Sequence, residues 1–274
     1  MKLSGKTKIT GLFGYPVEHS LSPAMHNAAF EALGLDYCYV AFPVHPDSLK
    51  DAVLAIKALN LAGVNVTIPH KEIVIPFLDE IDKEASIIGA VNTIVNSSGR
   101  LKGYNTDGRG FMQSLFESGI SVENKEVLII GAGGASRALS YYLGKEAKKV
   151  YLYDIEKKKA EQLVEDFKNT HTNISTVDNV SKIDNFNIII NATPLGLKEE
   201  DPLPLDTTLI RSDQIVCDLI YKNTRLLKEA AKKECVILNG IGMLLWQGVF
   251  AFELWTGISP PVDIMRDALD KSLK

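Results

Sequence analysis

The segment from Lys125 to Asp154, KEVLIIGAGGASRALSYYLGKEAKKVYLYD, restricts the possible folds more than any other part of the chain. It begins with an apolar run of strand length, passes through a glycine-rich turn into a helical pattern, and ends on a second apolar run. Strands that are joined through a helix, rather than through a short hairpin turn, run parallel. The sequence therefore predicts a β-α-β unit and a parallel sheet here.

The turn of this unit has the composition of a phosphate-binding loop. Its glycines follow a strand and open a helix, where unpaired backbone N–H groups and the helix dipole attract a pyrophosphate. Ser136 occupies the position of the third glycine of the usual fingerprint. The predicted cofactor-binding residues of the turn are Gly131, Ala132, Gly133, Gly134 and Ala135. The alternative is a turn whose glycines only permit close packing of the helix on the strand.

Asp154, at the end of the second strand, bears on the choice of dinucleotide. An acidic residue there accepts hydrogen bonds from a ribose 2′-OH and repels a 2′-phosphate, which favours NAD over NADP. Two alternatives stay open. Asp154 caps the helix that follows, or the lysines at 157–159 reach a phosphate and reverse the preference. By default those lysines form a solvated helix face.

Length and composition describe an ordinary globular chain. At 274 residues it exceeds the usual size of one domain, so two domains are expected. A net charge of −4 without a basic stripe argues against a nucleic-acid partner. The 3 cysteines are widely spaced and fit neither a disulfide framework nor a metal site. The apolar runs suit neither a signal peptide nor a bilayer span, so we expect a cytoplasmic protein without a membrane partner, monomeric or homodimeric.

Strand-like and helix-like runs alternate along the chain, which indicates the α/β class with mostly parallel sheets. We expect strands at 8–14, 37–44 and 63–68, the last with one apolar face, and a hairpin within 89–108 that turns at 96–99. Ser22 is expected to cap a helix that Pro23 begins and Gly34 follows, and Gly144 is expected to end another helix. We also expect a linking helix at 108–119, buried strands within 186–196, 214–221 and 235–242, and a C-terminal helical segment broken at 260–261.

Polar side chains recur at the ends of strands in the first half of the chain. They are Asn65 and Thr67, then Asn92 and Thr93, then Asn105, Thr106 and Asp107. A small polyhydroxylated ligand needs such donors and acceptors once its hydroxyl groups lose water. Any single pair is better explained as turn or cap residues, but three such groups near a lysine favour a binding site.

Lys71 and Asp107 complete this polar set. A lysine held beside a carboxylate can give a proton to a developing alkoxide or take one from an alcohol, as hydride transfer at a carbinol requires. The alternative is an ordinary surface salt bridge. The 5 histidines show no metal-ligand spacing, so no metal is expected, and His70 is expected to shape its loop.

The string EHSLSP brings Ser20 and Ser22 to the start of a predicted helix. Two hydroxyl groups beside unpaired backbone N–H groups suit a carboxylate. Capping by Ser22 is the simpler alternative, although it leaves Ser20 unexplained.

Eight strings, taken in order, resemble the shikimate dehydrogenase family over nearly the whole chain. They are GYPVEHSLSPAMHN, GVNVTIPHK, AVNTIV, GYNTDG, GAGGASRA, NATPLG, DLIY and GIGMLLWQGVFAFELWTG. The resemblance implies an N-terminal α/β substrate domain, residues 1–106 with 241–274, facing a Rossmann-type dinucleotide-binding domain, residues 107–240, across a cleft. It also implies the NADPH-dependent reduction of 3-dehydroshikimate to shikimate in aromatic amino acid biosynthesis.

The resemblance also implies roles for individual residues. Lys71 and Asp107 become the catalytic acid/base pair. The implied substrate-binding residues are Ser20 and Ser22 for the carboxylate, Thr67, Asn92, Asp107 and Gln247 for the hydroxyl groups, Asn65 in support and Tyr221 from the other domain. Thr193, Gly240 and Met243 are implied to flank the nicotinamide end of the cofactor.

Two features depart from the family pattern. NADP-dependent members usually carry an Asn-Arg-Thr-like run after the second Rossmann strand, whereas Asp154 and Ile155 stand here at the Asn and Arg positions. NADP thus follows from the resemblance, and NAD is favoured by Asp154. The stretch after Tyr221 is also shorter than usual.

Three other functions are alternatives to this one. The first is an NAD-dependent quinate/shikimate dehydrogenase, which Asp154 would suit, although Ser20 favours the biosynthetic enzyme. The second is a non-catalytic Rossmann-type sensor, against which the presence of Lys71 and Asp107 argues. The third is a folate dehydrogenase of similar build, against which the serine pair and Gln247 argue.

Overall fold

The computed structural model describes residues 3–273 and divides the chain into two compact units. The first unit runs to Gly110 and resumes at Leu244, and the second is Phe111–Met243. Both divisions fall inside helices, namely α4 (Asp107–Glu117) and α8 (Ile241–Thr256). Relative to the expected domain bounds, residues 107–110 group with the first unit and residues 241–243 with the second.

The first unit is built on a mixed six-stranded sheet with the order β2-β1-β3-β5-β6-β4. Its strands are β1 (Lys8–Gly14), β2 (Tyr37–Pro43), β3 (Gly63–Val66), β4 (Glu80–Ile81), β5 (Thr93–Ser97) and β6 (Arg100–Tyr104). β1 runs parallel to β2 and β3, whereas β5 runs antiparallel to β3 and β6. The expected strands at 8–14 and 37–44 are confirmed, the second ending one residue early.

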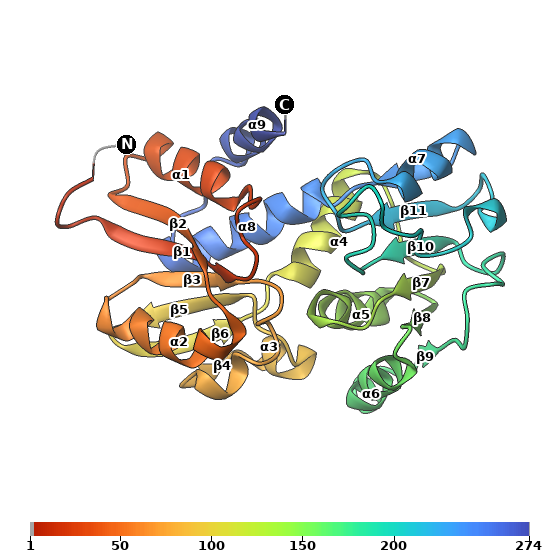
Figure 1. Cartoon of the computed structure of the whole chain (residues 1–274), viewed down its shortest axis with the longest axis horizontal. Helices are drawn as coiled ribbons and strands as arrows, with labels where there is room; N and C mark the ends of the chain where they lie inside the picture. Colours follow the sequence, from red (N-terminus) through yellow and green to blue (C-terminus); the bar gives the residue numbers. More distant parts are fainter. Residues whose placement is uncertain (1–2, 274) are drawn as a thin grey trace. The chain divides into compact units, whose positions relative to one another are not determined.

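Helices cover both faces of this sheet (Figure 1). They are α1 (Ser22–Ala32), α2 (Leu49–Ala58), α3 (Lys83–Ile88), α8 and α9 (Val262–Ser272). One apolar core joins α1, α8 and α9 to the sheet, and a second joins α2 and α3 to it. The expected break in the C-terminal helical segment is confirmed between α8 and α9.

Burial on both faces corrects the expectation for the third strand. Val64, Asn65 and Val66 are all buried, so the strand has no solvent-facing side. The ladder stops at Val66, and Ile68, expected to lie on an apolar face, is 63% exposed. The alternation of apolar and polar residues therefore does not separate a buried face from an exposed one, because a strand between two helical layers is buried on both faces.

The start of α1 also differs from expectation. Ser22 is the first residue of the helix, and Leu21 occupies the N-cap position without a side-chain cap. The Ser20 Oγ accepts a hydrogen bond from the Ser22 N–H at 3.3 Å. The prediction of Ser22 as the capping residue is therefore wrong, since Ser20 supplies the oxygen at this end.

The hairpin of β5 and β6 is confirmed, and it sets the register around the later site. Ser98 and Gly99, the two central residues of its turn, have φ values of 53° and 88°, as a turn that matches the twist of the strands requires. The Gly99 N–H donates to the side chain of Asn96 at 2.8 Å. Because Thr93 then stands opposite Tyr104, the polar residues before β5 and after β6 become neighbours.

The second unit contains a six-stranded, fully parallel sheet (Figure 1). Its strands are β7 (Glu126–Ile130), β8 (Lys149–Tyr153), β9 (Ile174–Thr176), β10 (Ile188–Asn191), β11 (Ile215–Asp218) and β12 (Val236–Leu238), and its helices include α5 (Gly134–Glu146), α6 (Lys157–Phe167) and α7 (Arg225–Lys232). Numbered within the unit, the strands lie in the order 3-2-1-4-5-6. This is the order of a doubly wound dinucleotide-binding fold, so the predicted Rossmann-type sheet is confirmed.

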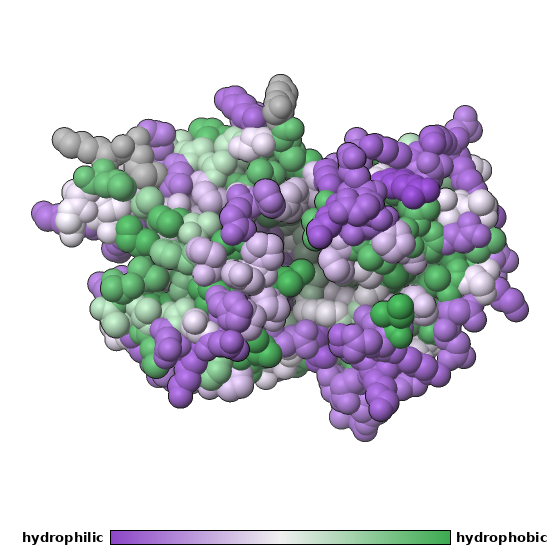
Figure 2. Space-filling model, in the orientation of Figure 1, coloured by the Kyte–Doolittle hydropathy of each residue, from purple (hydrophilic) through white to green (hydrophobic). Residues whose placement is uncertain are grey.

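Two expectations for this unit are wrong. Gly144 lies inside α5, not at its end; a Cβ there would lie 2.9 Å from the ring of His171, so close packing explains this glycine. β12 is not buried, since Val236 is 54% exposed on an edge strand. The lysines at 157–159 are exposed, and Figure 2 shows hydrophilic side chains gathered over α6. Within residues 3–273, no helix is long and apolar enough to cross a membrane.

Candidate active site

Lys71 and Asp107 form a nearly buried ion pair in the first unit. The Lys71 Nζ lies 2.5 Å from the Asp107 Oδ2. Only 14% of the Lys71 side chain and 4% of the Asp107 side chain are exposed. An exposed salt bridge, the alternative interpretation, would be screened by water, whereas charges this buried need further hydrogen bonds. The structure thus brings together the two residues that the sequence analysis paired.

Backbone contacts hold both members of this pair. Asp107 is the first residue of α4, and its N–H donates to the Asn105 Oδ1 at 3.0 Å. The Asn105 Nδ2 donates in turn to the Ala90 C=O at 2.9 Å. Lys71 follows β3, and its C=O accepts a hydrogen bond from the Val91 N–H at 2.8 Å. Both charged residues are therefore anchored to the segments that flank the sheet.

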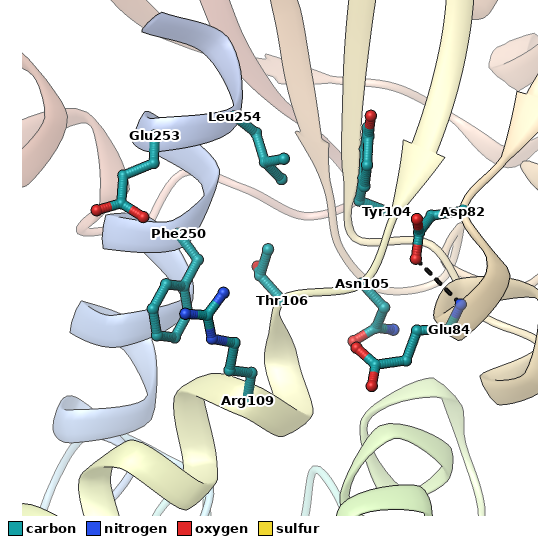
Figure 3. Close-up of a pocket in the computed structure, with 9 residues that line it drawn as sticks. All are labelled: Asp82, Glu84, Tyr104, Asn105, Thr106, Arg109, Phe250, Glu253 and Leu254. Carbon is teal, nitrogen blue, oxygen red and sulfur yellow. Dashed lines mark hydrogen bonds between the residues drawn. The ribbon is translucent and has the colours of Figure 1, made fainter. Parts of the chain in front are cut away.

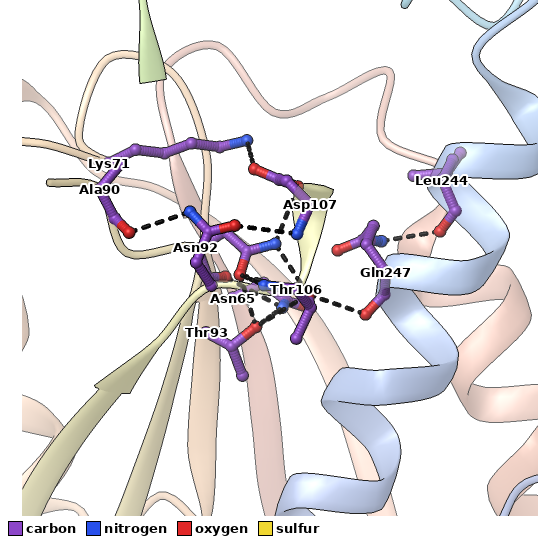
Figure 4. Close-up of polar contacts among 10 residues, drawn as sticks. Asn65, Lys71, Ala90, Asn92, Thr93, Thr106, Asp107, Leu244 and Gln247 are labelled. Carbon is purple, nitrogen blue, oxygen red and sulfur yellow. Dashed lines mark hydrogen bonds and ion pairs between the residues drawn. The ribbon is translucent and has the colours of Figure 1, made fainter. Parts of the chain in front are cut away.

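The amide of Asn92 is a second hydrogen-bond partner of the Asp107 carboxylate (Figure 4). Its Nδ2 donates to the Asp107 Oδ1 at 2.8 Å and to the Thr106 Oγ1 at 2.9 Å. Its Oδ1 accepts from the Thr106 N–H at 2.8 Å. Asn92 therefore orients the carboxylate oxygen that does not face Lys71.

Strand register brings the remaining amides and hydroxyls into the same network. Asn65 of β3 stands opposite Thr93 of β5, and the Asn65 Nδ2 donates to the Thr93 Oγ1 at 3.0 Å. The Thr93 hydroxyl donates to the Asn92 Oδ1, also at 3.0 Å. The Thr106 hydroxyl donates to the Gln247 C=O at 3.0 Å, which ties α8 to the network. Five expected site residues are thus connected: Asn65, Lys71, Asn92, Asp107 and Gln247.

Thr67 and the serine pair have other surroundings. The methyl group of Thr67 packs on Gly14, where an added Cβ would lie 2.3 Å from the Thr67 Cγ2. Ser20 is half-buried at the start of α1, while Ser22 is buried. The Ser22 side chain hydrogen-bonds the hydroxyl of Tyr39, which leads into the network through Asn65.

The buried histidines have structural surroundings. The His70 Nε2 lies 2.7 Å from the Val44 C=O, which holds the loop after β3. His26 is enclosed by aromatic rings, and burial lowers its pKa from 6.5 to about 3. Over residues 3–273, no group of three or more His, Cys, Asp or Glu side chains is placed to hold a metal ion.

A pocket of about 300 Å³ in the first unit is lined by Asn105 and Thr106 but not by the ion pair (Figure 3). The Arg109 guanidinium lies 3.9 Å from the centre of the Phe250 ring on its wall. Three carboxylates also line it, those of Asp82, Glu84 and Glu253. This pocket carries charges of both signs, and Lys71 and Asp107 do not line it. We therefore assign it no catalytic role.

The glycine-rich turn of the second unit fits a dinucleotide. Gly131 has a φ of +105°, and a Cβ there would lie 3.0 Å from the Ala192 carbonyl, so the backbone explains this glycine. Gly133 has a φ of −87°, and a Cβ on it would meet no described atom within 4 Å. No hydrogen bond from a described side chain caps the N-terminus of α5. Backbone donors therefore face open space, as a pyrophosphate requires.

Asp154 holds this turn through both carboxylate oxygens. Oδ2 accepts from the Ala132 N–H at 2.9 Å, and Oδ1 accepts from the Glu156 N–H at 2.8 Å. Glu156 is the N-cap residue of α6, so the alternative that Asp154 caps this helix is wrong. A negative charge nevertheless lies at the end of β8, where a ribose binds in this fold. Ile155 beside it is 91% exposed.

The lysines after Asp154 are largely engaged with carboxylates. Lys157 pairs with Asp178 at 2.8 Å, and Lys159 pairs with Glu156 at 2.6 Å. These contacts offset two of the three positive charges at 157–159. They weaken the alternative that the lysines form a phosphate site.

The other residues expected near the nicotinamide also follow carboxyl ends of strands. Thr193 comes after β10, and its Cγ2 would lie 3.1 Å from a Cβ on Gly131. Gly240 follows β12, and a Cβ on it would lie 2.0 Å from the Leu219 carbonyl oxygen. Met243 is buried, and Tyr221, expected to reach the substrate, is half-buried after β11. Parallel strands gather binding residues at this edge.

Three family models match successive parts of the chain. A shikimate dehydrogenase substrate binding domain matches residues 12–94, a shikimate/quinate 5-dehydrogenase domain matches residues 112–196, and a shikimate 5′-dehydrogenase C-terminal domain matches residues 240–269. The shikimate dehydrogenase (NADP(+)) of Desulforamulus reducens is 47% identical over 284 aligned positions, covering 99% of this chain and 98% of that protein. The chain belongs to the shikimate dehydrogenase family.

Solved structures of shikimate dehydrogenases share this fold over nearly their whole length. The enzyme of Aquifex aeolicus is 42% identical with a TM-score of 0.93, and all of both chains is covered. The shikimate 5-dehydrogenase of Listeria monocytogenes, solved in complex with shikimate and NAD, is 39% identical with a TM-score of 0.87, covering 97% of this chain and 98% of that one.

Sequence reasoning missed two buried residues of this chain. Tyr39 donates to Asn65, but an aromatic residue in an apolar strand resembles ordinary core. Asp218, at the end of β11, accepts hydrogen bonds from Asn191 and Thr224, and burial raises its pKa. An acidic residue ending a buried strand was a readable signal there, as it was for Asp154.

Asp154→Asn is expected to raise the ratio of NADP to NAD turnover about five- to tenfold, since one negative charge near the ribose is removed. Parallel steady-state assays of both cofactors measure the ratio. Glu161→Gln on α6 is the control, because it removes an exposed carboxylate of the same helix. An unchanged ratio would restrict Asp154 to holding the glycine-rich turn.

Proposed function

We propose that this chain is a shikimate 5-dehydrogenase, which reversibly reduces 3-dehydroshikimate to shikimate for aromatic amino acid biosynthesis. The observation that carries the proposal is the buried pair of Lys71 and Asp107 within a network of amides and hydroxyls. Membership of the family over the whole chain supports it. Cytoplasmic location and oligomeric state stay predictions.

Lys71 is the proposed proton donor in the direction of reduction. As hydride reaches the carbonyl carbon, the oxygen becomes an alkoxide, and the Lys71 ammonium gives it a proton. Asp107 holds the ammonium at 2.5 Å, so that its position is fixed before the transfer. In the direction of oxidation, the neutral amine takes the proton from the alcohol, and solvent restores the starting state.

The remaining residues of the network are proposed to orient the substrate. Ser20 and Ser22, at the start of α1, are suited to its carboxylate. Amide and hydroxyl groups of Asn92, Thr67 and Gln247 are suited to its ring hydroxyls, while the buried amide of Asn65 supports them. Tyr221, in the second unit, is a further proposed substrate-binding residue. Orientation of this kind lowers the entropic part of the barrier.

The proposed cofactor is NADP, which the name of the Desulforamulus relative carries. The nicotinamide supplies the hydride when it is bound. The turn at residues 131–135 would hold its pyrophosphate through the N–H groups of residues 133–135, since those of Gly131 and Ala132 donate to the Tyr153 C=O and to Asp154. Thr193, Gly240 and Met243 would lie toward the nicotinamide end. Asp154 would meet the ribose, and its charge is the feature of this chain that favours NAD.

The test is shikimate-dependent formation of reduced nicotinamide by the purified protein, followed by absorbance. NADP and NAD are run side by side, with quinate as the second substrate. Turnover of shikimate is the expected result. Measurable binding of shikimate without turnover of either cofactor would contradict the proposal and favour a sensor.

An NAD-dependent quinate/shikimate dehydrogenase is the second candidate, favoured by the carboxylate of Asp154 at the end of β8. It predicts faster turnover with NAD than with NADP, together with clear turnover of quinate. The same assay separates the two candidates.

A further inference from the structure

Tyr39 begins a chain of hydrogen bonds that ends on Asp107. Its hydroxyl donates to the Asn65 Oδ1 at 2.8 Å. The Asn65 Nδ2 donates to the Thr93 hydroxyl at 3.0 Å, and this hydroxyl donates to the Asn92 Oδ1 at 3.0 Å. The Asn92 Nδ2 donates to the Asp107 Oδ1 at 2.8 Å, and Figure 4 shows the last three links. Every donor in this chain points toward the carboxylate.

The Tyr39 hydroxyl contributes to the direction of the first of these bonds. An amide has one accepting and one donating end; the phenol holds the accepting end of Asn65, and the Asn92 C=O accepts from its donating end at 3.1 Å. Burial raises the pKa of Tyr39, so the hydroxyl stays protonated and donates. Buried hydrogen bonds that point the same way polarise one another. Without the phenol, the Asn65 Oδ1 loses this donor inside the protein.

The ring of Tyr39 is held in one place. It is 2% exposed and stacks on His26, with ring centroids 4.5 Å apart and planes 10° from parallel. Trp255 packs beside it at 5.9 Å. The Ser22 side chain hydrogen-bonds the same hydroxyl. The phenol thus lies between the proposed carboxylate end of the site and the amides that lead to the ion pair.

We propose that Tyr39 is a positioning residue for the acid/base pair. Its hydroxyl fixes Asn65, and through Thr93 and Asn92 it fixes the carboxylate that holds Lys71. The inference rests on the proposed function, because the effect assigned to Tyr39 is on the turnover of shikimate. Tyr39 acts through Asn65 and not on the substrate itself.

Tyr39→Phe tests this inference, since it removes one oxygen and keeps the stacked ring. The kcat for shikimate is expected to fall roughly tenfold, because Asn65 loses one of the contacts that fix its orientation. The KM for the nicotinamide cofactor is expected to stay near that of the unaltered protein, whereas the melting temperature should fall by several degrees, because a buried acceptor loses its donor. Tyr37→Phe, on the same strand, is the matched control, because within residues 3–273 its hydroxyl accepts a single exposed hydrogen bond, from the Lys8 Nζ at 3.4 Å.

Thr93→Val interrupts the same chain further along with little change of volume, and its kcat should fall by a similar factor. The double variant should lose no more than the larger single loss, because both changes break one chain. A normal kcat in Tyr39→Phe, or losses of kcat that multiply in the double variant, would overturn this inference and leave the proposed function standing. A lack of shikimate turnover by the unaltered protein would instead overturn the proposed function, and the inference with it.

Discussion

Lys71→Ala is expected to lower the turnover of shikimate by roughly two to four orders of magnitude, the usual size of a lost general acid/base. Within residues 3–273, the buried network around Asp107 contains no other amine that could supply the proton. The affinity for shikimate should stay within about tenfold, because the amides and serines proposed to bind the ring and its carboxylate are unchanged. Steady-state rates and calorimetric binding separate the two effects.

A second variant separates proton transfer from the packing of the pair. Lys71→Gln keeps an N–H donor for the Asp107 carboxylate but has no proton to transfer at neutral pH. It should fold like the unaltered protein and be as slow as Lys71→Ala. Lys57→Ala is the control, since it breaks a half-exposed pair with Asp79 in the same unit. Nearly normal turnover by either Lys71 variant would mean that another group moves the proton.

His26→Phe is expected to remove much of the acid sensitivity of the first unit. Burial lowers the pKa of His26 in the folded state from 6.5 to about 3. Above pH 6.5 neither the folded nor the unfolded state binds this proton, so the stability is fully present. As the pH falls from about 6.5 to about 3, only the unfolded state gains the proton. The free energy of unfolding then drops by up to about 5 kcal/mol, at 1.36 kcal/mol per pH unit.

The surroundings of His26 explain this expectation. Its ring lies against Tyr39 and Trp255, with centroids 4.5 Å and 5.3 Å away. Neither ring nitrogen has a hydrogen-bond partner among the described residues. A positive charge at this place would have neither water nor an anion beside it. Phenylalanine keeps the stacked ring and cannot titrate.

Urea unfolding followed by tryptophan fluorescence makes the comparison specific. The chain has 2 tryptophans, Trp246 and Trp255, and both belong to the first unit. Between pH 6.5 and about 4.5, the unaltered protein should lose roughly 2–2.5 kcal/mol more than His26→Phe. His45→Phe, which removes an exposed imidazole, should keep the full acid loss. Equal losses in the unaltered protein and in His26→Phe would contradict the account.

Local patterns predicted the parts of the fold that depend on neighbouring residues. The strand, glycine turn and helix from Glu126 to Glu146 follow from apolar runs and glycine, and so does the hairpin at Ser98 and Gly99. Such signals are read within a few residues along the chain. Lys71 and Asp107, 36 residues apart, were paired because a lysine and a carboxylate accompanied the same set of polar residues, and the family resemblance then implied that they are the catalytic pair.

Other features depend on contacts that no local pattern carries. Gly144 resembled the end of a helix. The position requires a glycine because His171, far along the chain, packs against it. β3 resembled a strand with one apolar face, yet helices from distant segments cover both faces and bury Asn65. Tyr39 acquires its place in the network only through the register of three strands. Tertiary packing decided each case.

The most direct test of the central claim is a crystal structure of the protein with shikimate bound. The account predicts a ring hydroxyl within hydrogen-bond distance of the Lys71 Nζ and the Asp107 carboxylate, with the shikimate carboxylate on Ser20 and Ser22. Shikimate bound away from Lys71, for example in the pocket beside Arg109, would contradict it.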